Sequence, residues 1–226
     1  MTHEGEPTDQ SLPGPNDGVL EPAQGRSSDL ELPQDAVVEN LIRLLSHSTQ
    51  ALTHEEYMDS TRKRQDAVDK FLIRGGVESL RRFFNRVKQL EEQESIKLDL
   101  SMLEISDKLL GGLYLPGANL EKLIFSMSDI SGSDIRAARL TGVVATGAVM
   151  RGIIATGSNW TDAVAPGADA SGGRFVGCRF INTDMTDWIV DRDTNFAGAI
   201  FISTYIGNMD LSVPNTVGAV FRGLRR

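Results

Sequence analysis

The residue types that most often carry catalysis or bind metals are scarce in this chain of 226 residues. Its three histidines, His3, His47 and His54, stand in no metal-ligand spacing. The single cysteine, Cys178, has no partner for an intramolecular disulfide, which fits a reducing compartment. We expect a buried, inert thiol, and we predict no enzyme activity, no metal and no cofactor.

Two short segments imitate ligand-binding loops, and each lacks a residue that the chemistry requires. Asp191–Asn195 reads D-x-D-x-N, the opening of a calcium loop, but Phe196 and Ile202 occupy the places of the required glycine and bidentate acid. Residues 172–177 have the glycine spacing of a phosphate loop, yet Cys-Arg follows where Lys-Ser/Thr is needed. We therefore interpret the first as a polar loop and reject the second.

The net charge of −8 is concentrated at the start of the chain. Residues 1–35 carry eight acids and one base, while residues 212–226 gain three positive charges from arginines. The first segment is rich in Pro, Gly, Ser, Asp and Glu without hydrophobic periodicity, so we predict a disordered acidic tail over residues 1–35. The acidic balance argues against direct binding of nucleic acid.

The sequence shows neither a membrane span nor a secretion signal. No apolar run approaches the roughly 20 residues of a membrane helix, and the start of the chain has neither a basic nor an apolar stretch. We therefore expect a cytoplasmic protein.

Residues 36–95 have the periodicity of helices. One apolar stripe comprises Val37, Val38, Leu41, Ile42, Leu44 and Leu45. Thr53–Glu56 forms a capping box that should start a helix running to about Ile73, where Gly75-Gly76 should end it. A third helix is predicted after these glycines, with its basic residues on a solvated face and its apolar stripe docked on the C-terminal part of the chain.

The strongest signal is a period of five residues, which neither a helix nor a flat strand produces. Every fifth residue from Leu100 to Met185 is apolar. The residue two before each of these centres is often small, and the residue two after is mostly glycine, a residue that tolerates positive φ. A large inward residue, a small inward residue and a corner therefore recur, and four such units make one coil of about 20 residues.

This pattern resembles the pentapeptide-repeat family, whose motif is A-(D/N)-L-x-x. Residues 118–122, read as Ala-Asn-Leu-Glu-Lys, match it closely, and 128–132 and 133–137 follow well. The resemblance implies an α+β fold in which a right-handed quadrilateral β-helix over residues 96–211 follows about three α-helices. Residues 212–226 are then expected to form a C-terminal cap and a loose basic tail, and one extra residue between Ile189 and Asn195 predicts a bulge.

One outward column is apolar where the family often has Asp or Asn. Because stacked coils lie about 4.8 Å apart, residues 20 apart on one face should form a continuous stripe. The stripe comprises Ile124, Val144 and Val164, and adjoining faces add Val149 and Ile154. Either the N-terminal helices cover this stripe, or it binds a protein partner or a second copy of the chain.

Three functions fit these features. The first is a non-enzymatic scaffold that binds a protein partner of unknown identity through a rigid β-helix. The second comes from the resemblance, because some pentapeptide-repeat proteins mimic DNA, bind type II topoisomerases such as gyrase and confer fluoroquinolone resistance. That mechanism needs a dense negative surface, whereas residues 110–211 carry a net charge of only −3. The third is a secreted bacterial effector with a disordered N-terminus.

Overall fold

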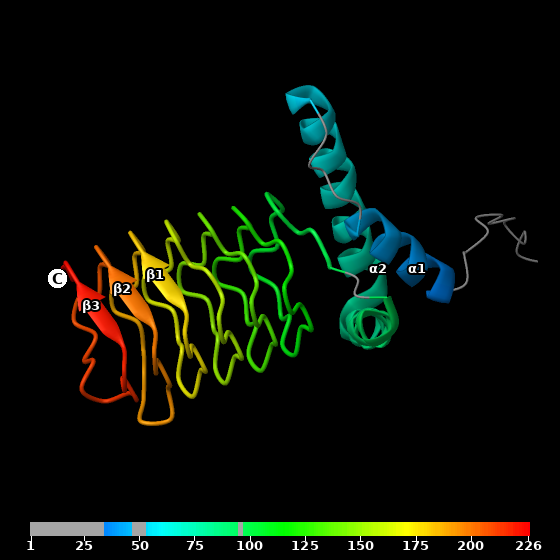
Figure 1. Cartoon of the computed structure of the whole chain (residues 1–226). Coiled ribbons are helices and arrows are strands. Elements are labelled where there is room, and N and C mark those ends of the chain that lie inside the picture. The colour runs from blue at the N-terminus through cyan, green and yellow to red at the C-terminus, as the bar shows by residue number, and fades with distance from the viewer. Residues whose placement is uncertain (1–33, 47–52, 95–96) are drawn as a thin grey trace, which may run out of the picture. The chain divides into compact units, whose positions relative to one another are not determined.

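The computed structural model describes residues 34–46, 53–94 and 97–226 (Figure 1). The predicted tail over residues 1–35 falls outside this part of the chain, apart from its last two residues. Residues 32–226 form one unit. None of the described helices is both long enough and apolar enough to cross a membrane.

Helix α1 spans Gln34–Leu45, as its apolar stripe predicts. The buried side chains are those of Val38, Leu41, Ile42 and Leu45, which recur at helical spacing. Val37 lies at the edge of the stripe and is exposed.

Helix α2 spans His54–Glu94 and begins at the predicted capping box. The backbone N–H of Thr53 donates to Glu56 Oε2 over 2.9 Å. The backbone N–H of Glu56 donates back to Thr53 Oγ1 over 3.4 Å. The hydrogen bond from the Thr53 backbone lowers the pKa of Glu56, because it stabilises the carboxylate. Two backbone donors of the first turn are thereby satisfied.

The prediction that the helix ends at Gly75-Gly76 is wrong, and the described part of the chain contains two helices instead of three. The helical hydrogen-bond pattern continues through both glycines to Glu94. However, the Phe71 and Phe83 rings lie 5.7 Å apart, whereas a straight helix would separate residues twelve apart by about 18 Å. The helix must therefore bend sharply between them, where the adjacent glycines remove steric resistance to bending.

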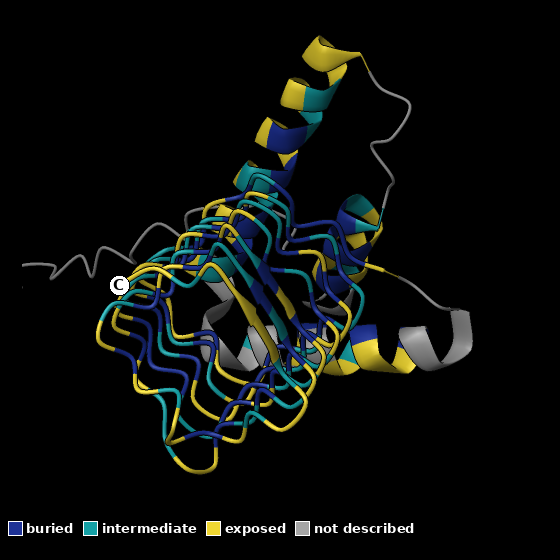
Figure 2. Cartoon of the chain, turned by 60° about the vertical axis from the view of Figure 1, so that its left-hand side comes forward, coloured by how far each residue is buried: buried dark blue, intermediate teal, exposed yellow. Residues whose placement is uncertain are grey.

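The rest of the chain winds in coils of 20 residues that pair in parallel (Figure 1). Up to Ile189, each coil contributes one residue to each of four bridge ladders, which pass through Asn119, Ile124, Asp129 and Asp134. Two longer pairings join the strands β1 (Arg179–Ile181), β2 (Ile200–Ile202) and β3 (Val220–Arg222), in that order in one parallel sheet. Buried residues alternate with half-buried and exposed ones along each coil (Figure 2).

The corner residues, which lie two after each inward centre, have the positive φ that the sequence predicts. The glycines among them have φ between 52° and 77°. Lys122, Met127 and Ala137 occupy the same position with φ of 56°, 57° and 55°, a conformation that costs a residue with a Cβ roughly 1–2 kcal/mol. The corners are thus set by backbone geometry, and most of them use glycine because it avoids this cost.

The coil interior is filled by the predicted centres. Trp160 is fully buried, and its ring centroid lies about 6 Å from those of Phe175, Phe180 and Trp188. The small inward column is partly polar, and its threonine hydroxyls donate to carbonyls of the preceding coil. Thr183 Oγ1, for example, donates to the Trp160 carbonyl over 2.7 Å. The interior is therefore close to fully satisfied in its hydrogen bonds.

The predicted bulge between Ile189 and Asn195 is confirmed. Asp169 pairs with Ile189, 20 residues later, whereas Arg174 pairs with Asn195, 21 residues later. The extra residue is held in a turn around Asp191, whose Oδ1 accepts hydrogen bonds from the backbone N–H of Gly172 and of Thr194, each over 2.9 Å.

The structure differs from the prediction at the C-terminal side, where residues 212–226 were expected to form a cap and a loose tail. Pairing continues through Asn195 with Asn215, β2 with β3, and Tyr205 with Arg225. Phe221 occupies the inward position and stacks on Phe201 at 4.9 Å. The spacing of five thus persists beyond Leu211 although Thr216 interrupts its apolar column.

Side chains of α2 take the place of a preceding coil at the first edge of the repeat. Gln65 accepts a hydrogen bond from the Glu104 backbone N–H over 2.7 Å and donates to its carbonyl over 2.8 Å. Arg64 donates to the carbonyls of Asp99 and Ser101. An open strand edge leaves such backbone groups without partners, so these two side chains cap the coil.

Candidate protein-binding surface

The predicted outward stripe is a continuous ladder on one face of the coil. We call Ile124, Val144 and Val164 the apolar ladder, because parallel bridges join each to the next. Val144 N–H donates to the Leu123 carbonyl over 3.0 Å, and the Val144 carbonyl accepts from Phe125 N–H over 2.9 Å. These two bonds tie Val144 to the preceding coil, and Val143 and Ala145 bond Val164 in the following one, so the three side chains are held at the spacing of the coils.

The hydrogen bonds of the described helices reach the first coil, including the start of the ladder that contains Ile124. They join the helices to Asp99, Ser101 and Glu104. Val164 remains 42% exposed, while Ile124 and Val144 are half-buried. The alternative that the helices cover the whole stripe therefore does not hold for Val164.

Val149 and Ile154 do not belong to the apolar ladder. Val149 is half-buried and stands between Asp129 and Asp169 in the next ladder. Ile154 is half-buried in the ladder after that, between an aspartate and an arginine. Each is a single apolar side chain flanked by charges, so the structure separates them from the continuous stripe.

Met127 is an apolar surface residue that the sequence pattern missed. It lies at a corner, where the repeat usually has glycine, and it is 64% exposed. Its sulfur lies so close to Gly147 that a Cβ on that glycine would approach it within 2.6 Å. Met127 thus extends along the coil axis and adds apolar surface one corner away from the apolar ladder. The one sequence signal that could have identified Met127 is its position at a corner, where the repeat usually has glycine.

Acidic residues stand at both ends of the apolar ladder. Glu104 precedes Ile124 in the same ladder, and Asp184 follows Val164. At the Glu104 end, Gln65 Nε2 donates both to the Glu104 carbonyl and to Asp69 Oδ1, which brings a further carboxylate close. The arrangement is an uncharged stripe with negative charge at either end.

Cys178 and Asp191, which the sequence offered as candidates for chemistry, have structural roles. Cys178 is fully buried, and its thiol donates to the Ala155 carbonyl over 2.9 Å. Burial raises the pKa of Cys178 to about 11, so the reactive thiolate is disfavoured. The calcium-loop imitation uses its first carboxylate, Asp191, to hold the bulge. In the part of the chain that the structure describes, no cluster of three or more His, Cys, Asp or Glu residues could hold a metal.

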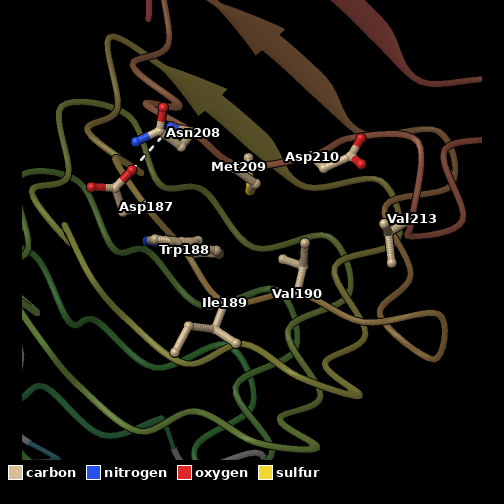
Figure 3. A pocket seen from close by; sticks show the side chains of 8 residues that line it. All are labelled: Asp187, Trp188, Ile189, Val190, Asn208, Met209, Asp210 and Val213. Carbon is tan, nitrogen blue, oxygen red and sulfur yellow. Dashed lines mark hydrogen bonds between the residues drawn. The ribbon is translucent and has the colours of Figure 1, made fainter.

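A pocket of about 380 Å³ opens beside the bulge (Figure 3). It forms where the ladder that ends at Ile189 has no partner in the following coil. Trp188 and Met209 make its buried floor, while Asp187 and Asp210 lie on opposite sides (Figure 3). Hydrogen bonds from Ser212 lower the pKa of Asp210. Both carboxylates accept backbone N–H groups, from Asn208 and Ser212 respectively, and so stabilise the irregular turn.

Comparison with known families decides what the repeat is. The family model for pentapeptide repeats matches residues 146–182 with eight copies. Residues 146–182 are therefore similar to pentapeptide repeats. The parallel coil extends well beyond the matched segment on both sides. No curated protein matches the chain.

Several solved structures are similar to this chain. QnrB1, a plasmid-mediated fluoroquinolone resistance protein, is 15% identical, with 54% of this chain and 78% of that chain covered and a TM-score of 0.28. HetL from the cyanobacterium Nostoc, a pentapeptide-repeat protein involved in regulating heterocyst differentiation, is 13% identical over 62% and 93% of the two chains, with a TM-score of 0.24. Rfr23 from the cyanobacterium Cyanothece is 12% identical over 62% and 93%, with a TM-score of 0.22. At these values, nothing that those proteins do is carried over to this chain.

Proposed function

We propose that this chain is a non-enzymatic scaffold that binds a protein partner through the apolar ladder. The observation that carries the proposal is the continuous outward run of Ile124, Val144 and Val164, because none of the other outward bridge ladders of the described coil has three apolar members in succession. A rigid backbone holds these residues at fixed spacing, so they can bind without an entropy cost of ordering the surface. A cytoplasmic location is part of the proposal, and the unpaired buried thiol of Cys178 supports it.

We further propose that the coil is the right-handed quadrilateral β-helix that the resemblance implies. Four bridge ladders per 20-residue coil support this geometry, as does the corner residue of positive φ in every unit from Met102 to Asp187. Such a rod exposes four long faces. The single apolar ladder therefore fits a partner that contacts only one of these faces.

The alternative of DNA mimicry finds less support in the described surface. Acids of the coil are paired with bases in three places, Asp134 with Arg136, Asp169 with Arg151 and Glu121 with Arg139. Arginines also stand directly in the outward ladders. A DNA mimic requires an uninterrupted negative surface, and ion pairs reduce it.

Affinity capture with quantitative mass spectrometry tests the scaffold function. The full chain, Val144→Lys and the control Val149→Lys serve as baits, after equal melting temperatures have shown that all three fold. We expect Val144→Lys to lose at least one partner that the other two retain, because a lysine desolvated in an apolar contact is costly. Identical protein sets for all three baits would refute the proposal.

A gyrase supercoiling assay tests the alternative separately. Inhibition or protection of gyrase by micromolar protein would favour DNA mimicry, and its absence would remove that function.

A further inference from the structure

We infer that the apolar ladder binds an amphipathic α-helix of a partner protein, and that this helix carries basic residues at both ends of its apolar stretch. The inference rests on the proposed protein-binding function and names the chemistry of the partner. Three observations carry it: the spacing of the apolar ladder, the charges at its ends and the consequence of those charges for self-association.

The spacing of the ladder fits a helix lying along the coil axis. Consecutive members are stacked about 4.8 Å apart, so Ile124 and Val164 are separated by about 9.6 Å. Apolar residues at positions i, i+3 or i+4, and i+7 of a helix recur on average every 5.3 Å or so and span about 10.5 Å. An extended strand repeats on one face about every 6.7 Å and falls out of register by the third residue. The helix is therefore the better match.

The charges at the ends of the ladder require bases on the partner. Glu104 and Asp184 are four coils apart, which corresponds to about 19 Å or about 13 helical residues. Glu104 is exposed and Asp184 half-buried, and Asp69 adds negative charge near Glu104. An apolar helix flanked by Lys or Arg at this separation would place opposite charges together at both ends.

The same charges disfavour a second copy of the chain as the occupant. If two apolar ladders pair in antiparallel register, Glu104 of one copy lies opposite Asp184 of the other. If they pair in parallel, Glu104 meets Glu104 and Asp184 meets Asp184. Either arrangement that overlaps all three apolar residues places acids against acids at both ends, which opposes association.

Synthetic helical peptides of about 17 residues test the inference by fluorescence anisotropy with the full chain. The test peptide carries leucine at i, i+4 and i+7 with arginines about 13 residues apart, and two control peptides carry glutamates at the ends or a scrambled leucine pattern. We expect the arginine peptide to bind about tenfold or more tightly than either control. Val144→Lys should weaken this binding by about tenfold or more, while Val149→Lys should leave it unchanged.

A charge-neutral variant, Glu104→Gln/Asp184→Asn, identifies the source of the preference. We expect it to reduce the discrimination between arginine and glutamate peptides to less than about threefold while still binding the leucine face. Binding that ignores the end charges, or no binding of any peptide, would overturn the inference. So would a dimer in sedimentation that dissociates on Val144→Lys. If capture by Val144→Lys is unchanged, the proposed function fails; if Val144→Lys loses a partner in capture but no peptide binds the wild type, only the helix-binding inference fails.

Discussion

The buried ion pair between Arg64 and Asp99 allows a sharp prediction about how the helices hold the coil. The Arg64 side chain is 1% exposed and that of Asp99 11% exposed, and Nη1 lies 3.2 Å from Oδ1. The Nε of Arg64 has no hydrogen-bond partner in the described structure. Its charge therefore depends on Asp99 and on the carbonyls of Asp99 and Ser101.

The two ends of this pair should respond unequally to mutation. With a separation of 3.2 Å and an effective dielectric constant of about 20, the attraction is about 5 kcal/mol. Asp99→Asn leaves a buried guanidinium without its counter-charge and should lower the free energy of unfolding by about 3–5 kcal/mol. Arg64→Met should cost less, roughly 1–3 kcal/mol, because Asp99 keeps hydrogen bonds from Ser101 N–H and Asn119 Nδ2.

Urea unfolding with two probes separates the helices from the coil. Far-UV circular dichroism follows the helices, whereas both tryptophans of the chain, Trp160 and Trp188, lie in the coil and report it by fluorescence. We expect Asp99→Asn to shift the helical transition to lower urea before the fluorescence transition. In the double variant the losses should be clearly less than additive. A larger effect of Arg64→Met, or additive losses, would refute the reasoning.

Three further predictions concern single positions. Because burial raises the pKa of Cys178 from 9.0 to about 11, the folded state holds the proton more tightly; we expect stability to fall as pH rises from about 9 to 11, and Cys178→Ser to remove this dependence in pH-resolved urea melts. Ala137→Gly relieves a φ of 55° and should raise the free energy of unfolding by about 0.5–1 kcal/mol, whereas the neighbouring Ala138→Gly, at a buried inward position, should lower it; equal signs would contradict the assignment. Thr53→Ala removes a helix cap and should cost about 1 kcal/mol in the helical transition, with no change in tryptophan fluorescence at low urea; an unchanged helical midpoint would show that the cap contributes nothing.

The repeat could be predicted in detail because its information is local. Each unit of five residues carries its own inward centre and corner, so the pairing of Ile124, Val144 and Val164 and the bulge before Asn195 follow from counting along the chain. The candidate surface could be predicted for the same reason. The extent of the repeat beyond Leu211 could not be predicted, because Thr216 breaks the apolar column, and only the backbone pairing and the stacking of Phe221 on Phe201 reveal the continuation.

The sequence by itself determined the coil, its register and the face on which the apolar ladder lies, since a backbone with a fixed period turns sequence distance into spatial distance. Only the tertiary structure decided how the helices meet the coil. The bend between Phe71 and Phe83, the capping of the first coil by Arg64 and Gln65, and the exposure of Met127 all depend on contacts between residues that have no periodic relation. Glycines permit a bend without specifying it, and a lone arginine in an amphipathic helix gives no sign that a backbone edge will bury it.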